Sequence, residues 1–239
     1  MRDYLVDIVK HTRSVGNIDA VKVTDGTTVE AKDDDNKVIV KATYKNNIGN
    51  LKGVLGLPNL DKLNVIVNIP EYKENAKITV ETRERNGEAV PFNLHFENQS
   101  GDFKNDFRFM SKELVQQKIP EVRFKGAKWD VEFEPHEASN QRFKFQSQAN
   151  SEESMFVVKT ENGNLKFTFG DDTGHTGNFV FQSGISGELK QGWKYPIAEV
   201  MSVLNLNGDK QMKFSDQGAL QITVDNGMAV YEYIFPAQG

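Results

Sequence analysis

Hydrophobic and polar residues alternate with a period of two along most of the chain, and the alternating runs stop at turn residues. Such runs lie near residues 18–23, 38–44, 78–82, 155–159, 165–169, 219–224 and 228–235. Asp-Gly or Asn-Gly turn signals follow several of them, at Asp25-Gly26, Asn86-Gly87, Asn162-Gly163 and Asp225-Asn226-Gly227. These pairs favour tight hairpin turns because both residues tolerate positive φ. The pattern therefore predicts a strand-rich protein of antiparallel hairpins.

Four segments depart from this alternation and predict short helices. In the first, Leu5, Ile8 and Val9 share one helical face with Tyr4 and Thr12. In the last, apolar residues recur at i, i+3, i+4 and i+7 over residues 197–204, and Pro196 is placed at the first helical position.

The two middle segments give weaker helical signals. Ile48, Leu51, Val54 and Leu55 form a short helical stripe that Gly49, Gly53 and Gly56 weaken. Over residues 135–149, Phe143 and Phe145 alternate as in a strand, whereas the Ser-, Asn-, Gln- and Arg-rich composition suits a polar helix.

The order of the predicted elements repeats along the chain. Residues 1–110 read helix, strands, helix, strands, and residues 123–239 repeat that order. Residues 111–122 show no clear period and contain Ile119-Pro120, so a connector is favoured there over a short helix. The predicted fold class is α+β, with two similar domains that each place two short helices on one face of antiparallel sheets.

Composition narrows the functional classes. A charged fraction of 26% with 16 Phe among 239 residues indicates a folded protein, and no apolar run approaches the roughly 20 residues of a membrane span. The absence of Cys excludes disulfides and thiolate metal sites, and it suits a reducing compartment. A net charge of −5 excludes a uniformly basic nucleic-acid binder but allows a basic face.

A search for catalytic motifs predicts no enzyme, no cofactor and no metal. The four His lack the spacing of a zinc motif, and neither a phosphate-binding loop nor a Gly-x-Ser-x-Gly elbow is present. Asp33-Asp34-Asp35 is interpreted as a solvated turn rather than a cation site. The segment from Asp171 to His175 lacks the spacing of a calcium loop, so a Gly-rich hairpin turn is favoured.

Basic residues gather on the predicted helices, whereas acidic residues gather at the predicted hairpin tips. Lys10 and Arg13 lie on or just after the first helix, Lys52 lies on the second, and Arg142 and Lys144 lie on the third. A solvated helix surface is the simpler interpretation. If the helices share one face, however, a net-negative protein would still offer that face to phosphates.

Several segments resemble the sliding clamps of DNA replication, the family of proliferating cell nuclear antigen (PCNA) and the bacteriophage clamps. Residues 193–204 resemble the last inner helix of that family, and residues 211–214, 218–224 and 230–237 resemble its closing strands. Residues 106–121 are similar to the last strand of domain one and the connector that follows it. Asn50 to Gly56 is similar to the second inner helix of phage clamps.

The resemblance implies a non-enzymatic homotrimeric ring, of phage type, that encircles double-stranded DNA without sequence specificity. Its implied partners are a replicative DNA polymerase, a clamp loader ATPase and, in some phages, late-transcription factors, all in the host cell cytoplasm. A ring stays on DNA through topology, so each phosphate contact can be weak. The implied DNA-facing residues are Lys10, Arg13, Lys52, Arg142 and Lys144.

The resemblance also implies a subunit interface and a partner site. The family plan places the interface on edge strands at residues 103–109 and 178–182, where apolar contacts would come from Phe107, Phe109, Phe179 and Phe181. Packing of these four rings in the core of their own domain is equally expected. The partner-peptide pocket would be lined by Leu114, Ile119, Pro120, Tyr233, Phe235 and Pro236, although each residue taken alone suits core or tail packing.

Two other functional classes remain open at this point. A β-rich phage structural or carbohydrate-binding module without DNA function would explain the strands, the Phe content and the acidity, but not the repeated helices. A metal-dependent hydrolase that uses the acids around His175 is the third and weakest alternative.

Overall fold

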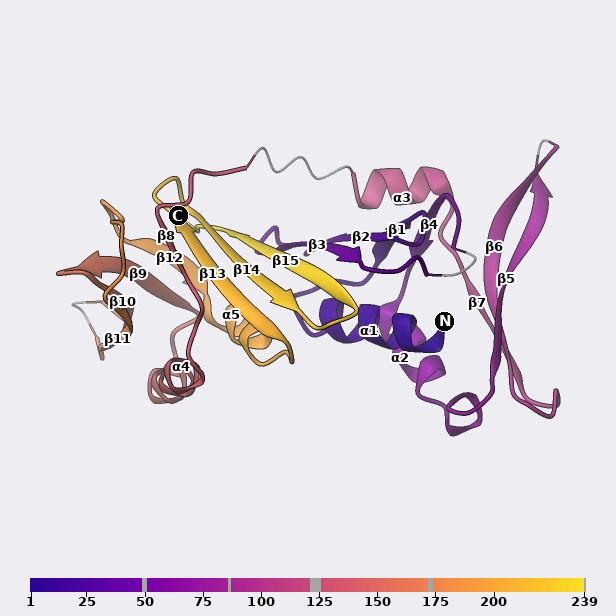
Figure 1. Cartoon of the computed structure of the whole chain (residues 1–239), viewed down its shortest axis with the longest axis horizontal. Helices are drawn as coiled ribbons and strands as arrows, with labels where there is room; N and C mark the ends of the chain where they lie inside the picture. Colours follow the sequence, from indigo (N-terminus) through magenta and orange to yellow (C-terminus); the bar gives the residue numbers. More distant parts are fainter. Residues whose placement is uncertain (49–50, 86, 121–125, 172–173, 239) are drawn as a thin grey trace. The chain divides into compact units, whose positions relative to one another are not determined.

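The computed structural model describes residues 1–48, 51–85, 87–120, 126–171 and 174–238. Its chain divides into two compact units (Figure 1). Unit 1 comprises Met1–Asp33 and Val40–Val122, and unit 2 comprises Asp34–Ile39 and Arg123–Gly239. Unit 1 contains most of the first half of the sequence, and unit 2 contains the second.

Unit 1 begins with a helix and four short strands. The helix α1 (Arg2–Thr12) precedes β1 (Val21–Thr24), β2 (Thr28–Lys32), β3 (Ile39–Tyr44) and β4 (Val54–Leu57). These strands have the order β4-β1-β2-β3, and buried residues alternate along β1, β2 and β3 as the period of two predicts. Asp25 and Gly26 both have positive φ, 49° and 61°, in the turn between β1 and β2, which confirms that hairpin signal.

The second helix of unit 1 lies farther along the chain than predicted. Residues 54–57 form strand β4, which pairs with β1, and helix α2 (Leu60–Val67) begins after Asn59. The Asn59 side chain caps α2 by accepting a hydrogen bond from the Lys62 backbone N–H at 2.9 Å. The prediction of a helix around residues 48–55 is therefore wrong for Val54 and Leu55, while Gly49 and Asn50 lie outside the described residues.

Helices α1 and α2 contact one another and lie on one face of strands β1 to β3 (Figure 1). Leu5, Ile8 and Val9 of α1 are buried, which confirms the predicted apolar face of the first helix. On α2 the buried residues are Leu60, Leu63, Ile66 and Val67. The two helices thus pack their apolar faces inward, and α1 also buries Asp7, His11 and Thr12, while Lys10 and Lys62 remain exposed.

A second sheet of unit 1 contains β5 (Lys77–Arg85), β6 (Glu88–Glu97) and β7 (Lys104–Arg108), after the short 3-10 helix η1 (Pro70–Tyr72). The strands are antiparallel in the order β5-β6-β7, so β7 ends the sheet. Leu94, Phe96 and Phe107 are buried on one face, where Tyr72 packs against Phe96 with 5.5 Å between ring centres.

Helix α3 (Lys112–Lys118) occupies the segment in which a connector was favoured over a short helix. Ser111 caps it by accepting a hydrogen bond from the Leu114 backbone N–H. Val115 is buried and packs against β4 at Gly56. The alternative of a short helix is therefore the correct one for residues 112–118, and a polar surface with a single buried contact explains why the sequence shows no clear period there.

Unit 2 contains two runs of four antiparallel strands. One has the order β15-β14-β13-β8 and the other β11-β10-β9-β12. The bounds are β8 (Val131–Phe133), β9 (Met155–Glu161), β10 (Asn164–Phe169), β11 (Gly177–Ser183), β12 (Trp193–Pro196), β13 (Asp209–Ser215), β14 (Ala219–Asp225) and β15 (Ala229–Pro236). The Asn162-Gly163 turn has positive φ at both residues and connects β9 to β10, as predicted.

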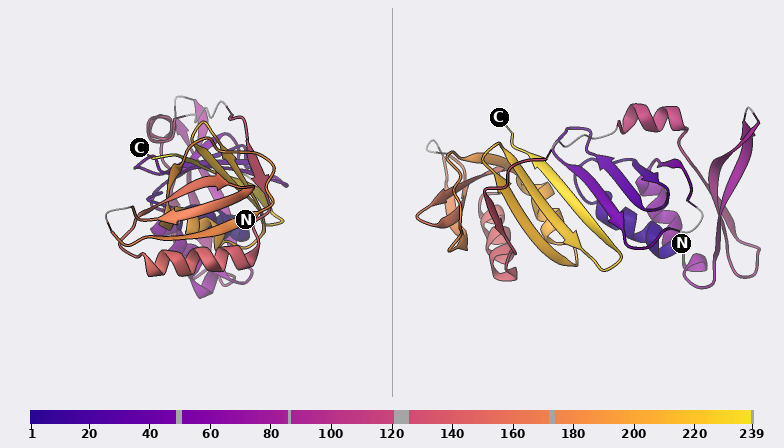
Figure 2. Two further views of the ribbon diagram at one scale, coloured as in Figure 1. Left: turned by 90° about the vertical axis from the view of Figure 1, so that its left-hand side faces the viewer. Right: turned by 45° about the horizontal axis from the view of Figure 1, so that its top comes forward.

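The two helices of unit 2 confirm the predicted positions. Helix α4 (Glu137–Ala149) covers one face of the sheet that contains β10 and β11 (Figure 2), and helix α5 (Ile197–Leu204) contacts α4. Pro196 is the residue before the first helical position rather than that position itself, because it also ends strand β12.

Aromatic residues form the core of unit 2. Phe143 of α4 is fully buried and contacts Phe156, with 4.8 Å between ring centres, and Phe167 stacks on Phe181 at 4.3 Å. Burial of a Phe side chain stabilises a fold by about 1.5–3 kcal/mol relative to exposure. Phe143 thus acts as a helix residue that faces the sheet, which resolves the ambiguity of residues 135–149 in favour of the helix.

Candidate functional site

The exposed surface of the helix pair in unit 1 carries three cations. Lys10 of α1 and Lys62 of α2 are exposed, and within the described parts of the chain no carboxylate lies at ion-pair distance from either. Arg13 follows α1 directly, and its guanidinium donates to the carboxylate of Asp61 on α2. The charge of Arg13 is therefore already matched by an acidic neighbour.

Lys52 is not on a helix, which corrects its predicted position. It is exposed in the loop before β4. The cation that α2 provides is Lys62, which the sequence reasoning missed. A usable signal was present, because Leu60, Leu63 and Val67 recur at i, i+3 and i+7 after the capping residue Asn59.

Arg142 and Lys144 both lie on α4 and are exposed, but they have different surroundings. Arg142 Nη1 donates a hydrogen bond to the backbone oxygen of Val180 at 3.1 Å, and its guanidinium carbon lies 5.2 Å from the ring centre of Phe179. Arg142 is thereby held against strand β11. For Lys144, the structure gives no ion pair among the described residues, so its ammonium group remains available to an anion.

The four paired helices are electrically balanced. They carry the cations Arg2, Lys10, Lys62, Arg142 and Lys144, and the carboxylates of Asp3, Asp7, Asp61, Glu137 and Glu199. The chain as a whole has a net charge of −5, so its excess of acid lies outside these helices. Asp7 is buried and Arg13 lies just beyond α1, so the exposed charges near these helices are less acidic than the rest of the chain, which allows weak, salt-sensitive contact with a polyanion.

The predicted edge strands end their sheets, but most of the aromatic residues predicted there face inward. β7 and β11 are the terminal strands of their sheets. Phe107, Phe179 and Phe181 are 2%, 6% and 2% exposed, whereas Phe109 is half-buried just beyond β7. The three buried rings are core residues of their own units. What an edge strand offers a partner is its row of unpaired backbone groups.

The six residues of the predicted partner pocket belong to different units. In unit 1, Leu114 on α3 is 50% exposed and Pro120 is exposed, while Ile119 is buried. In unit 2, Tyr233 and Phe235 on β15 are fully buried and Pro236 is half-buried. The two aromatic rings thus act as core of unit 2, and the pocket itself stays a prediction.

Unit 1 contains a pocket of about 520 Å³ that brings together two residues predicted for separate roles, Lys52 and Phe109. Arg83 and Arg108 also line it, with guanidinium carbons 4.4 and 4.2 Å from the centre of the Phe92 ring. Cation–π contacts of this kind hold both guanidinium groups over the aromatic ring. The pocket therefore combines positive charge with apolar surface.

The predictions for the two acidic segments, residues 33–35 and 171–175, compare differently with the structure. Asp34 and Asp35 are exposed in a turn between β2 and β3, as predicted, whereas Asp33 is only 1% exposed and accepts a hydrogen bond from the Asn17 backbone N–H at 2.5 Å, so the solvated-turn interpretation is wrong for Asp33 alone. Between β10 and β11, Asp171 and His175 are exposed, but residues 172–173 lie outside the described part of the chain. The sequence reasoning missed a third group, Glu81, His95 and Asp106 on β5, β6 and β7.

No membrane-spanning helix is present among the described residues, since none is both long and apolar enough.

Comparison with known proteins shows the fold. No family model matches the chain, and no curated protein matches it in sequence. Solved PCNA structures match its full length. They include A. fulgidus PCNA bound to the C-terminal region of FEN-1 (TM-score 0.69, 10% identity, 100% of this chain and 96% of that chain). The Entamoeba histolytica PCNA gives a TM-score of 0.67 at 11% identity, again with 100% and 96% covered.

A complex of PCNA2 and PCNA3 from Sulfolobus tokodaii gives a TM-score of 0.64 at 13% identity, with 99% of this chain and 96% of that chain covered. These matches span both units at very low sequence identity. The chain therefore has the PCNA clamp fold, an α+β fold of antiparallel sheets with few short helices.

Proposed function

We propose that this chain is a sliding clamp of DNA replication, of the phage type, which closes into a homotrimeric ring around double-stranded DNA. The observation that carries this proposal is the full-length match, since 100% of the chain aligns with 96% of the A. fulgidus PCNA chain. A domain that shared only part of the clamp fold would leave a large segment of one chain unmatched.

The helix surfaces support passage of DNA without sequence readout. Each unit exposes the polar face of one helix pair, and together these helices are electrically balanced. Contacts to phosphate carry no sequence information, and a small number of them gives weak binding that falls with salt. In a closed ring such weak contacts suffice, because the ring is retained by topology and can slide.

Ring closure would use the sheet edges. β7 ends a sheet in unit 1 and β11 ends a sheet in unit 2, so the two edges are different surfaces. A contact between two different surfaces is heterologous, and it forms a ring when its rotation closes. We propose that β7 of one subunit pairs with β11 of the next, with backbone hydrogen bonds as the main contact.

The partners follow from the same proposal. The A. fulgidus PCNA is bound to the C-terminal region of FEN-1, and the Sulfolobus tokodaii structure is a complex between two PCNA chains. By analogy, this chain would bind short peptide segments of a DNA polymerase and would assemble with its own copies. A clamp loader ATPase would place it on DNA, late-transcription factors are further candidate partners, and the host cytoplasm is the expected compartment. As a scaffold, it would perform no catalysis.

Light scattering after size-exclusion chromatography tests the assembly. The purified chain at micromolar concentration is expected to elute with three times the chain mass of 27.0 kDa. Negative-stain images of the same fraction are expected to show rings with a central hole. A monomeric mass and compact particles would instead support a β-rich binding module without DNA function.

A further inference from the structure

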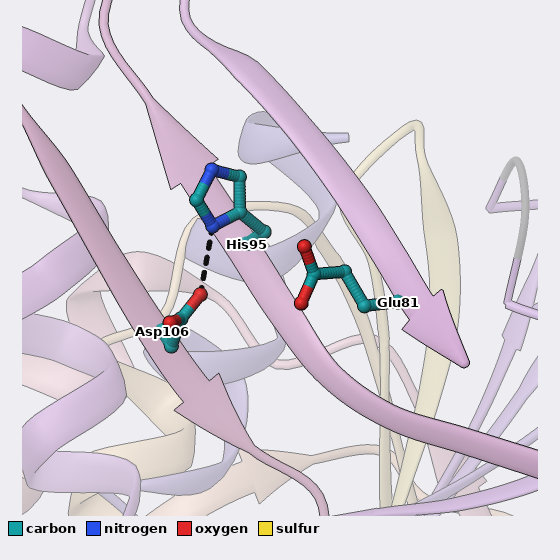
Figure 3. A group of neighbouring side chains, drawn as sticks. All are labelled: Glu81, His95 and Asp106. Carbon is teal, nitrogen blue, oxygen red and sulfur yellow. Dashed lines mark hydrogen bonds and ion pairs between the residues drawn. The ribbon is translucent and has the colours of Figure 1, made fainter. Parts of the chain in front are cut away.

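Three side chains that carry metal-binding chemistry meet on one face of the three-stranded sheet of unit 1. Glu81 of β5, His95 of β6 and Asp106 of β7 point toward one another (Figure 3), and one ligand atom from each lies within 4.8 Å of the other two. His95 Nδ1 is 2.7 Å from Asp106 Oδ1. Glu81 and Asp106 are exposed, so an ion can reach the cluster from solvent.

The strand register explains this convergence. Asp106 lies opposite His95 in the β6–β7 pairing, and Glu81 lies opposite Asn93, two residues before His95 on the same face of the sheet. The opposite face of the sheet is core, where Leu94 and Phe107 are buried. The three backbones are thus fixed by hydrogen bonding and packing, which preorganises their side chains.

Neighbouring groups orient the three side chains. Asn93 is only 3% exposed, and its amide nitrogen donates to Glu81 Oε2 at 3.0 Å and to Asp106 Oδ1 at 3.1 Å. On the other side of the imidazole, His95 Nε2 lies 3.4 Å from Glu97 Oε2. A carboxylate on the second nitrogen of a His is the usual support of a metal-binding imidazole, because it fixes the ring and its tautomer.

The charges around the cluster favour a cation. The carboxylates of Glu81 and Asp106 lie beside the imidazole, so the cluster offers two negative charges to a cation. Lys104 of β7 pairs with Glu97, whose Oε2 lies 3.2 Å from the Lys104 Nζ, while Arg83 and Arg108 lie over the ring of Phe92. Asp106 contacts the His95 imidazole, and both Glu81 and Asp106 accept hydrogen bonds from the Asn93 amide.

We propose that Glu81, His95 and Asp106 bind one divalent first-row transition-metal ion, with Zn²⁺ as the best fit. Zn²⁺ accepts imidazole nitrogen together with carboxylate oxygen at about 2.0–2.2 Å, so the exposed carboxylates need only small rotations to close on it. Ca²⁺ and Mg²⁺ prefer all-oxygen sites and would bind more weakly. Because the ligands come from three strands, the ion would tie the end strand β7 to β5 and β6.

Calorimetric titration of the metal-free, full-length protein with ZnCl₂ tests the site without DNA or partners. One ion per chain is expected to bind, and to raise the thermal unfolding midpoint. In His95→Gln both effects are expected to disappear, while circular dichroism shows a folded protein. Glu97→Gln keeps the three ligands but loses the support of the imidazole, so its affinity is expected to fall by about 10–100-fold.

His136→Gln is the matched control. His136 is exposed at the start of α4 in unit 2, so this variant is expected to bind zinc as the wild-type chain does. The proposal is overturned if the wild-type protein binds no zinc, if folded His95→Gln binds it unchanged, or if His136→Gln loses binding as His95→Gln does. These results do not depend on whether the chain forms a ring.

Discussion

The Arg13 guanidinium donates to the carboxylate of Asp61, and this contact joins the end of α1 to the first turn of α2 across 48 residues of sequence. The two side chains are 46% and 76% exposed, so the pair is a surface contact that contributes little to stability. Its effect on binding is larger, because it neutralises one of the cations that the proposed function places opposite DNA.

Asp61→Asn is therefore expected to strengthen binding to duplex DNA. The substitution releases Arg13, and one additional phosphate contact steepens the dependence of log K on log salt by about one. Fluorescence anisotropy with a labelled duplex at several salt concentrations measures both quantities. Glu84→Gln is the control, because it removes one exposed carboxylate on β5 and releases no helix cation. If both variants gain the same affinity for DNA, the gain comes from the change in net charge and not from the release of Arg13.

Lys144→Glu is expected to weaken DNA binding and to shorten loader-dependent polymerase products while the oligomer stays intact. The reason is that Lys144 is exposed on α4 with no ion pair among the residues that the structure describes. Binding at several salt concentrations and light scattering are the measurements.

Arg142→Glu offers the comparison, since it also removes the hydrogen bond to the Val180 backbone on β11. This variant is expected to weaken assembly as well as binding. Unchanged DNA affinity in Lys144→Glu would show that this part of α4 does not face the duplex.

Gly56→Ala is expected to destabilise unit 1 and to displace α3. A Cβ at residue 56 would lie 2.7 Å from Met110 Cβ and would overlap the Val115 side chain, so either β4 or α3 must move. Overpacking of this kind typically costs about 1–3 kcal/mol. Urea denaturation measures the free energy of unfolding.

Gly174→Ala is the matched control, because among the described residues no atom other than those of its chain neighbours lies within 4 Å of the position that its new Cβ would occupy. A near-zero change is expected there. Equal stability of Gly56→Ala and the wild-type protein would contradict the close packing of α3 on β4.

Asp130 is expected to make the stability of unit 2 depend on acidic pH. Its carboxylate accepts a hydrogen bond from the Asp216 backbone N–H at 2.8 Å, which is the main cause that lowers its pKa below the ordinary value of 3.8; Lys128 adds to the shift. A lowered pKa in the folded state stabilises the protein above the pKa of the unfolded state. That contribution is lost as the pH falls through the folded pKa.

The variant Asp130→Asn should therefore be less stable than the wild-type protein at neutral pH, and the difference should shrink as the pH falls below 3.8. Urea denaturation between pH 7 and pH 3 measures this. Glu152→Gln removes an exposed carboxylate instead and is expected to show no such convergence. A difference in stability that stays constant with pH would rule out the proposed role of the carboxylate charge.

Elements with strong local signals were predictable from the sequence. The helices around Leu5 and Val200 and the hairpins at Asp25 and Asn162 follow from apolar periodicity and from turn residues that accept positive φ, whereas the helix around Phe143 was indicated only by its polar composition. Both signals act over a few neighbouring residues, so they do not depend on the rest of the fold.

Features set by distant residues were not predictable in this way. Val54 and Leu55 have helical spacing, yet pairing with β1 makes them a strand. The inward position of Phe107 and the convergence of His95 with Asp106 both depend on the register between strands, which one sequence does not reveal. The placement of Arg142 against β11 likewise depends on packing between α4 and the sheet.

Release from a short linear duplex is the most direct test of encirclement, and it needs no loader. At micromolar concentration a ring threads onto open DNA ends, and streptavidin bound to biotinylated ends then closes its exit. A closed ring is expected to dissociate slowly on dilution when the ends are blocked after binding, and quickly when they stay open. Little binding of the ring is expected when the ends are blocked first. Identical release rates from open and blocked duplexes would contradict a clamp that holds DNA by topology.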